Sequence, residues 1–288
     1  VFSQLDTPIT LCLTSPPYPL RRARNYGNPS EAEYVDFICR ALEPIVKNLV
    51  QGGSVVLNIS NDIFMPGSPA RSLYRERLVI ALCERLGLHK MDETIWMVPN
   101  KAPAPIEWAS KHRYQLNTAY EPIYWFCNDP IRSRSDNRRV LEPHSERHKQ
   151  LMARGGETRD VSFADGAYRI RPGDFGTVTP GRIPKNVVVR SHNCADKNAT
   201  RKTIQAMGLP SHPAMMPLSV AKFYIEFLTE PDDLVVDQYG GWMTTGKAAE
   251  ICGRRWLSTE VILEYARGAA ERFRSAPGFW LNPMLNSV

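Results

Sequence analysis

Residues Asp233 to Glu250 read DLVVDQYGGWMTTGKAAE, a short apolar strand followed by a glycine pair and the start of a helix. The strand ends in Asp237, and Gly240 and Gly241 follow it closely. Glycine lets a backbone approach a ligand, and the first turn of a helix offers free N–H groups. This order of elements is typical of a site for a nucleotide-like ligand in an α/β fold.

The next apolar segment, WLSTE, ends in Glu260, which lies 23 residues after Asp237. In such folds, a carboxylate about 20 residues further on stands at the tip of the neighbouring strand and binds ribose hydroxyls. We therefore predict a ribose contact at Glu260.

A second interpretation of the glycine loop is the phosphate loop of an NTPase, because Gly241 to Lys247 spells G-x-x-x-x-G-K. The next residue is Ala248, so the hydroxyl that would coordinate Mg²⁺ is missing. The charge of Asp237 just before the loop also disfavours a triphosphate. An NTPase and a purely structural strand–turn–helix remain the alternatives at this point.

The rest of the chain predicts strands alternating with helices. Short apolar strands in this alternation favour a doubly wound, mostly parallel α/β sheet with both faces covered. The predicted strands span 9–14, 53–60, 92–98, 120–127, 233–237 and 256–260, and the predicted helices span 30–52, 72–86, 218–229, a segment ending near 252, and one ending near 273.

The net charge of +6 is concentrated in one segment. Between Ile131 and Arg190 there are 13 Lys and Arg against 7 Asp and Glu, whereas the other residues hold 23 of each sign. A basic segment next to a neutral body is typical of a surface that contacts a phosphate backbone. A solvated, flexible insert is the alternative.

Other function classes find little support in the sequence. No apolar run approaches the roughly 20 residues that cross a bilayer, and we recognise no signal peptide. Six cysteines occur singly without a C-x-x-C, which favours reduced thiols in a cytosolic protein. His144 and His148 are four residues apart but lack an evident third ligand, so we predict no metal site.

Near the start of the chain, the apolar run ITLCL leads into TSPPY, Thr14 to Tyr18. The two prolines fix φ and remove backbone donors, which leaves a stiff turn with outward-facing carbonyls. Together with a hydroxyl and an aromatic ring, such a turn could hold a planar polar group. On these residues alone it could equally be only a loop.

Taken together, TSPPY and DQYGGWMTTG resemble the S-adenosylmethionine-dependent DNA amino-methyltransferases. The order resembles their permuted β class, with the catalytic motif first, the target-recognition region next and the cofactor loop last. Serine before the paired prolines is similar to the cytosine-N4 members, whereas adenine-N6 members more often carry aspartate. No cysteine follows a proline, which argues against cytosine-C5 methylation. Further segments similar to the family are NKAPAPIEW with NTAYEPIYWF, SDNRRVLEPHSERHKQLMARGGE, and SHPAMMP.

The resemblance implies a catalytic role for the turn. The Ser15 hydroxyl and the Pro16 carbonyl would accept hydrogen bonds from the target amine. Pro17 belongs to the same catalytic turn. Tyr18 would stack on a base flipped out of the duplex. Catalysis would come from positioning and electrostatics, with no covalent adduct between enzyme and base.

The resemblance also implies a cofactor site for S-adenosylmethionine. The usual loop form is D-P-F-x-G-S-x-T-T, and this chain has Trp242 where a small serine is usual. A large indole there is expected to crowd the ligand unless the loop bows outward, so a catalytically silent DNA-binding relative is an alternative. The implied contacts are Asp237, Tyr239, Gly240, Gly241, Thr244 and Thr245 around the methionine part, Glu260 at the ribose, and His212 and Pro213 closing over the cofactor.

The basic segment would bind double-stranded DNA and read its sequence. The resulting prediction is a Rossmann-like, sequence-specific DNA methyltransferase for cytosine N4, with adenine N6 as the alternative. It would act in the cytoplasm as a bacterial or phage-encoded enzyme of a restriction–modification system, with a cognate restriction endonuclease as a possible partner. The predicted phosphate contacts are Arg132, Arg134, Arg138, Arg139 and Arg147, and the predicted domains are residues 1–128 (first half of the catalytic domain), 129–190 (target recognition) and 191–288 (second half, with the cofactor loop).

Overall fold

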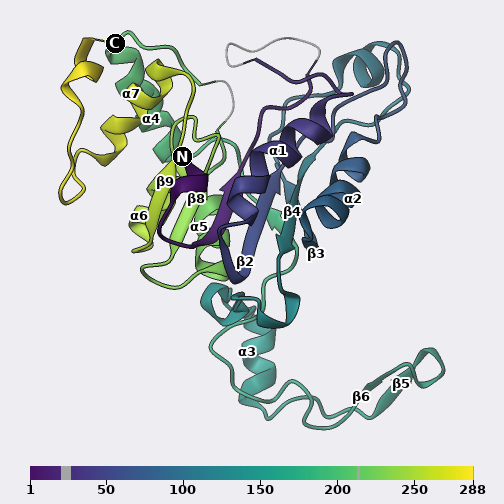
Figure 1. Cartoon of the computed structure of the whole chain (residues 1–288). Helices are drawn as coiled ribbons and strands as arrows, with labels where there is room; N and C mark the ends of the chain where they lie inside the picture. The colour runs from purple at the N-terminus through teal and green to yellow at the C-terminus, as the bar shows by residue number, and fades with distance from the viewer. Residues whose placement is uncertain (21–26, 213–214, 288) are drawn as a thin grey trace. The chain divides into compact units, whose positions relative to one another are not determined.

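A computed structural model describes residues 1–20, 27–212 and 215–287 (Figure 1). The chain divides into two compact units. The larger unit comprises Val1–Ser135 and Asn186–Val288, and the smaller one comprises Asp136–Lys185. The predicted basic region, 129–190, extends beyond the smaller unit at both ends, so its flanks belong to the larger unit.

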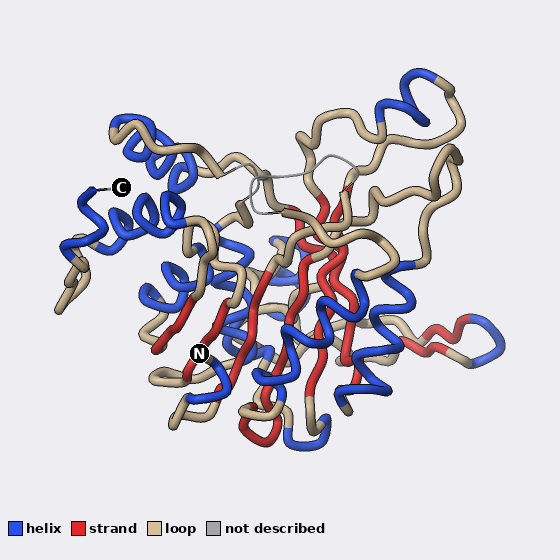
Figure 2. The backbone as a smooth tube through the Cα atoms, turned by 45° about the horizontal axis from the view of Figure 1, so that its top comes forward, coloured by secondary structure: helices blue, strands red, loops and turns tan. Residues whose placement is uncertain are grey.

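The described part of the larger unit contains a seven-stranded sheet with the order β7-β3-β4-β2-β1-β8-β9. Figure 2 draws the strands in red. All neighbouring strands pair in parallel except β4, which is antiparallel to both β2 and β3. This confirms the predicted doubly wound, mostly parallel sheet. The strands are β1 (Ile9–Thr14), β2 (Leu49–Asn58), β3 (His89–Met97), β4 (Tyr120–Cys127), β7 (Val187–Val189), β8 (Leu234–Asp237) and β9 (Arg255–Ser258).

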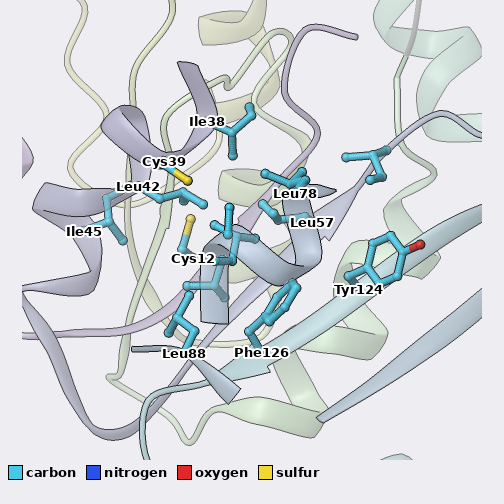
Figure 3. Close-up of a cluster of buried hydrophobic side chains, with 14 of the residues drawn as sticks. Cys12, Ile38, Cys39, Leu42, Ile45, Leu57, Leu78, Leu88, Tyr124 and Phe126 are labelled. Carbon is cyan, nitrogen blue, oxygen red and sulfur yellow. The ribbon is translucent and has the colours of Figure 1, made fainter. Parts of the chain in front are cut away.

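Helices cover both faces of this sheet because the central strands are apolar on both sides. Along β1, Cys12 points to one face, and Leu11 and Leu13 point to the other. The Cys12 face packs against α1 (Tyr34–Val46) and α2 (Tyr74–Leu86). Figure 3 shows part of this cluster, including Cys12, Ile38, Cys39, Leu42, Ile45 and Leu57. The opposite face packs against α5 (Leu218–Leu228) and α6 (Thr244–Ile251), and α4 (Ala195–Ala206) and α7 (Leu263–Ala270) complete the larger unit.

The connections that follow β1 and β8 run to opposite faces of the sheet. The chain after β1 continues into α1 on one face, whereas the chain after β8 continues into α6 on the other. In an open α/β sheet, ligands bind outside the carboxyl ends of the strands at such a switch point. The ends of β1 and β8, at Thr14 and Asp237, are therefore where a site is expected.

One predicted boundary is wrong. We expected a helix to stop at Gly52 and Gly53, but α1 ends at Val46 and β2 begins at Leu49 and runs through both glycines. Gly52 has φ +77°, and a Cβ there would lie 1.8 Å from the carbonyl oxygen of Arg132. The register of β1 against β2 also shifts in this region. Glycine is thus needed for an irregular strand and a close backbone contact, not for a helix end.

The smaller unit has very little interior. It contains α3 (Glu146–Ala153) and an antiparallel hairpin of β5 (Val161–Phe163) and β6 (Tyr168–Ile170). Within it only Gly156, Ile170 and Gly181 are buried. Several of its arginines form ion pairs on its surface.

Among the described residues, none of the helices combines the length and the hydropathy that crossing a bilayer requires.

Candidate active site

A cavity of about 680 Å³ opens at the carboxyl ends of β1 and β8. The turn after β1, residues 15–18, forms one wall. The loop after β8 and the start of α6 form another. Two segments from opposite ends of the chain therefore line one cavity.

Asp237 joins these two segments. Its Oδ1 accepts a hydrogen bond from the Thr14 hydroxyl at 2.7 Å and another from the backbone N–H of Tyr239 at 3.0 Å. The Thr245 hydroxyl donates in turn to the carbonyl of Leu13 at 3.2 Å. Burial raises the pKa of the Asp237 carboxyl, although the hydrogen bond from Thr14 works in the opposite direction.

The proline turn presents a connected set of hydroxyls to the cavity. The Ser15 Oγ lies 3.0 Å from the Tyr18 Oη, and both hydroxyls donate to Oδ1 of Asn58, at 3.3 Å and 3.0 Å. Asn58 ends β2, is buried, and donates through Nδ2 to the carbonyl of Pro122 at 3.4 Å. Because the amide oxygen can only accept, it draws both hydroxyl protons inward and leaves lone pairs of the Ser15 oxygen for a ligand. Ser15, Pro16, Pro17 and Tyr18 all line the cavity.

The glycine loop is held close to a carboxylate and an imidazole. The N–H of Gly241 donates to Oε2 of Glu260 at 2.7 Å, and Oε1 of Glu260 accepts from the N–H of Ile262 at 2.8 Å. Gly241 has φ +52°, and a Cβ there would lie 3.0 Å from Nε2 of His212. Pro213 lies outside the described residues. The predicted cofactor contacts on the cavity wall are Asp237, Tyr239, Gly240, Gly241, Thr244, Thr245, Glu260 and His212.

Trp242 does not line the cavity. Its side chain is 1% exposed and packs with Ile204, Met215 and Tyr265. The indole therefore does not occupy the cavity, where it was expected to crowd the ligand, because it is buried in this apolar cluster. This also removes the observation that motivated a silent relative.

Arg272, which the sequence analysis did not single out, holds the backbone of the glycine loop through hydrogen bonds. Its Nη1 donates to the carbonyl of Trp242 and to the Thr244 hydroxyl, and its Nη2 donates to Asp196 at 2.5 Å. The Arg272 side chain is only 4% exposed. Its partners lie 28 to 76 residues away in sequence, so local patterns carry no signal for this role.

The residues of the G-x-x-x-x-G-K pattern do not form a phosphate-binding loop in the structure. Lys247 donates to the carbonyl of Arg272 at 2.7 Å and lies over the ring of Phe273, and it is not on the cavity wall. Gly246 packs inside α6 against the ring of Trp256. The NTPase alternative therefore lacks its phosphate-binding lysine.

Other wall residues were also not predicted. They supply apolar surface and a third carboxylate, and the sequence offered a signal only for those in SHPAMMP. These residues include Leu20, Phe37, Ser60, Asp62, Met215 and Met216.

The predicted DNA-contacting arginines are not part of this cavity. Arg134 donates from Nη2 to both oxygens of Asp233, each at 3.1 Å, just before β8 begins. The carbonyl of Arg132 lies against Gly52 in the first half of β2. Both arginines are thus at the amino-terminal edge of the parallel strands, opposite the cavity. Arg138, Arg139 and Arg147 belong to the smaller unit, where Arg138 pairs with Asp136 at 2.7 Å.

The fold and the cavity define a class. A doubly wound sheet with a glycine loop and two carboxylates at its switch point is typical of α/β proteins that bind a nucleotide-like cofactor. A family model described as DNA methylase, N6_N4_Mtase, matches residues 9–271. The chain belongs to this family of DNA methylases, which confirms the resemblance seen in the sequence.

Curated relatives are similar over most of the chain. The type II methyltransferase M.PvuII of Proteus hauseri is 35% identical over 268 residues, covering 93% of this chain and 79% of the relative. The orphan methyltransferase M.BamHII of Bacillus amyloliquefaciens is 25% identical, covering 94% and 90% of the two chains.

Solved structures share the fold. The PvuII DNA methyltransferase, described as cytosine-N4-specific, superposes with a TM-score of 0.70 at 30% identity, covering 98% of this chain and 86% of that one. A putative DNA modification methylase of Thermus thermophilus, TTHA0409, solved with S-adenosyl-L-methionine, gives a TM-score of 0.55 at 19% identity, covering 96% and 91%. The second similarity concerns the fold alone.

Proposed function

We propose that this protein transfers a methyl group from S-adenosylmethionine to the exocyclic N4 amine of cytosine in DNA, as part of a restriction–modification system. The observation that carries the proposal is the shared cavity, in which the Ser-Pro-Pro-Tyr turn and the glycine loop face each other. Similarity to M.PvuII supports the choice of cytosine N4. Serine at position 15 supports it as well.

The residues of the cavity fit the cofactor. Its volume lies within the roughly 300–1,000 Å³ of typical small-molecule sites. The loop from Asp237 to Thr245 would hold the methionine part and Glu260 the ribose hydroxyls, with His212 and Pro213 closing over the cofactor. When bound, S-adenosylmethionine supplies an electrophilic methyl group on a sulfonium.

The chain's own residues would position the amine. A cytosine amine is conjugated with the ring and is a weak nucleophile. Hydrogen bonds to the Ser15 oxygen and the Pro16 carbonyl would orient it with its lone pair toward the methyl group. Asn58 does not titrate, so it would fix the direction of the Ser15 hydroxyl and would not serve as a base. Tyr18 would stack on the flipped base.

The rest of the chain would serve the DNA. We propose residues 129–190 as the target-recognition region, with Arg138, Arg139 and Arg147 of the smaller unit as phosphate contacts. Residues 1–128 and 191–288 would form the two halves of the catalytic domain. A cognate restriction endonuclease would be its partner, and the protein, encoded by a bacterium or a phage, would act in the cytoplasm.

The test is to incubate the protein with S-adenosylmethionine and mixed-sequence duplex DNA and to analyse the nucleosides by mass spectrometry. We expect N4-methylcytosine. N6-methyladenine would establish the alternative substrate. The formation of 5-methylcytosine, or unmodified DNA from a well-folded sample that binds the cofactor, would refute the proposed reaction.

A further inference from the structure

The segment from residue 98 to residue 118 connects β3 to β4 beside the cavity. Because β3 and β2 are both antiparallel to β4, β3 ends at the same edge of the sheet as β1 and β2. In Figure 1 the segment extends from this edge at the upper right and carries a short helix, η2 (Ile106–Lys111). It therefore lies on the side of the larger unit where a DNA substrate has to approach.

Hydrogen bonds fix this segment to the cavity wall. The Thr118 hydroxyl donates to Asp62 at 2.6 Å, and Asp62 lines the cavity. Arg71 bridges the same pair, with 3.1 Å to Asp62 and 3.3 Å to the Thr118 hydroxyl. Farther out, the Gln115 side chain donates to the carbonyl of Pro69 at 3.0 Å. The segment is thus preorganised, which lowers the entropic cost of binding a partner.

The outer surface of the segment is apolar and aromatic. Ile106 is 61% exposed, Tyr114 is 68% exposed and Leu116 is 87% exposed. The ring of Tyr114 stacks with that of His112 at 5.8 Å between centroids. Single exposed apolar residues are ordinary, but a group of them next to a cavity marks an interaction site.

Arg113 adds an uncommitted positive charge to this surface. Lys111 and His112 both contact Glu107, at 2.9 Å and 3.2 Å. Arg113 is exposed, and among the described residues no carboxylate lies within ion-pair distance of its guanidinium. It also has φ +63°, a left-handed conformation that is unfavourable for a residue with a side chain. Such strain is retained where surrounding structure enforces it, and it is frequent at ligand clamps.

We infer that residues 106–116 form a DNA-contacting surface next to the target base, separate from the basic segment 129–190. Arg113 would bind a backbone phosphate of the duplex, and Tyr114 and Leu116 would contact sugars and base faces beside the flipped nucleotide. This inference rests on the proposed function, because it takes duplex DNA as the partner. Arg255, an exposed arginine that begins β9 (Arg255–Ser258) at the opposite edge of the sheet, would make no such contact.

The test measures binding of a fluorescein-labelled, mixed-sequence duplex by anisotropy over a series of salt concentrations. We expect Arg113→Gly to weaken binding about tenfold at low salt and to reduce the salt slope by about 0.9, the value for one lost phosphate contact. Glycine accepts the left-handed backbone without strain, so this variant should fold. Arg113→Lys should retain most of the affinity. Arg255→Ala, which removes another exposed arginine of the larger unit, should leave binding unchanged.

A second readout separates this inference from the proposed function. S-adenosylhomocysteine binding, followed by calorimetry, should be equal in all variants. Absence of that binding in the wild type would refute the proposed function while leaving the duplex comparison intact. The inference itself fails if Arg113→Gly binds the duplex like the wild type, if Arg255→Ala loses as much affinity, or if the wild type does not bind the duplex.

The apolar part of the surface is tested independently of charge. The double variant Tyr114→Ser and Leu116→Ser should weaken duplex binding with an unchanged salt slope, because no phosphate contact is lost. Unchanged duplex affinity of this double variant would overturn the proposed contacts of Tyr114 and Leu116 with the DNA.

Discussion

At Ser15 the direction of one hydroxyl decides what the cavity offers to a ligand. Asn58 accepts from this hydroxyl and from that of Tyr18, so the Ser15 oxygen is left as an acceptor toward the cavity. We expect Ser15→Ala to lower kcat by about 10²–10³-fold, the range found when one positioned hydrogen bond is removed from a transition state. Affinities for the duplex and for S-adenosylhomocysteine should stay unchanged. Parallel losses of turnover and binding would show that Ser15 serves binding instead.

Asp237 makes stability depend on pH in a defined direction. Burial raises the pKa of the Asp237 carboxyl above its ordinary value of about 3.9. Between the ordinary pKa of the unfolded chain and the raised pKa of the folded chain, the folded chain therefore binds more protons than the unfolded chain. The free energy of unfolding contributed by this group therefore falls as pH rises through the window, and the penalty is complete above the raised pKa. Asp237→Asn removes it.

Urea unfolding without cofactor, at a series of pH values, measures this effect. The stability of the variant relative to the wild type should increase with pH, by about 1.4 kcal/mol for each unit by which the pKa is raised. A difference that is flat with pH, or that decreases as pH rises, would contradict the assignment.

The loop between β8 and α6 depends on glycine for two separate reasons. Gly241→Ala meets a left-handed φ of +52° and places its Cβ 3.0 Å from His212 on the cavity wall. We expect a loss of about 1–2 kcal/mol in unfolding free energy from the backbone. Affinity for S-adenosylhomocysteine should also fall, because His212 has to move.

Gly278→Ala is the matched control. Gly278 has φ +71°, but a Cβ there would meet no atom within 4 Å. It should lose similar stability and keep full cofactor affinity in the same calorimetric titration. Equal affinity for the two variants would show that the cofactor does not depend on the contact between residues 241 and 212.

The elements that follow local rules could be predicted from the sequence. The strand–glycine–helix order located β8, the loop and α6, and the end of α2 follows from Gly87, which has φ +65°. The start of β2 could not be predicted, because glycine is required at position 52 by close contact with the carbonyl of Arg132, which is 80 positions away in sequence.

The same distinction holds within the site. Ser15 and Tyr18 belong to a short motif, and so do the loop glycines. Asn58 and Arg272 carry no motif, because their roles consist of contacts with segments far away in sequence. Trp242 seemed obstructive from its position in the loop, and only the packing of Ile204 and Tyr265 around it shows that it faces elsewhere.

For the whole molecule, the larger unit contains the buried clusters and the cavity, whereas the smaller unit buries almost nothing. Replacing Asp136–Lys185 with a flexible Gly/Ser linker should therefore leave a folded protein that binds S-adenosylhomocysteine. Because this removes the proposed phosphate contacts and most of the target-recognition region, duplex affinity and sequence selectivity of methylation should be lost. Circular dichroism, calorimetry and sequencing of modified sites measure the three properties. Retained selectivity would contradict the proposed role, and loss of cofactor binding would contradict independent folding of the larger unit.

The most direct test of the whole account is a crystal structure with S-adenosylhomocysteine. It should show the ligand in the cavity between the proline turn and the glycine loop, with the ribose hydroxyls on Glu260 and the sulfur facing Ser15. A ligand bound outside this cavity, or with its sulfur directed away from Ser15, would contradict the claim that donor and nucleobase meet between the two ends of the chain.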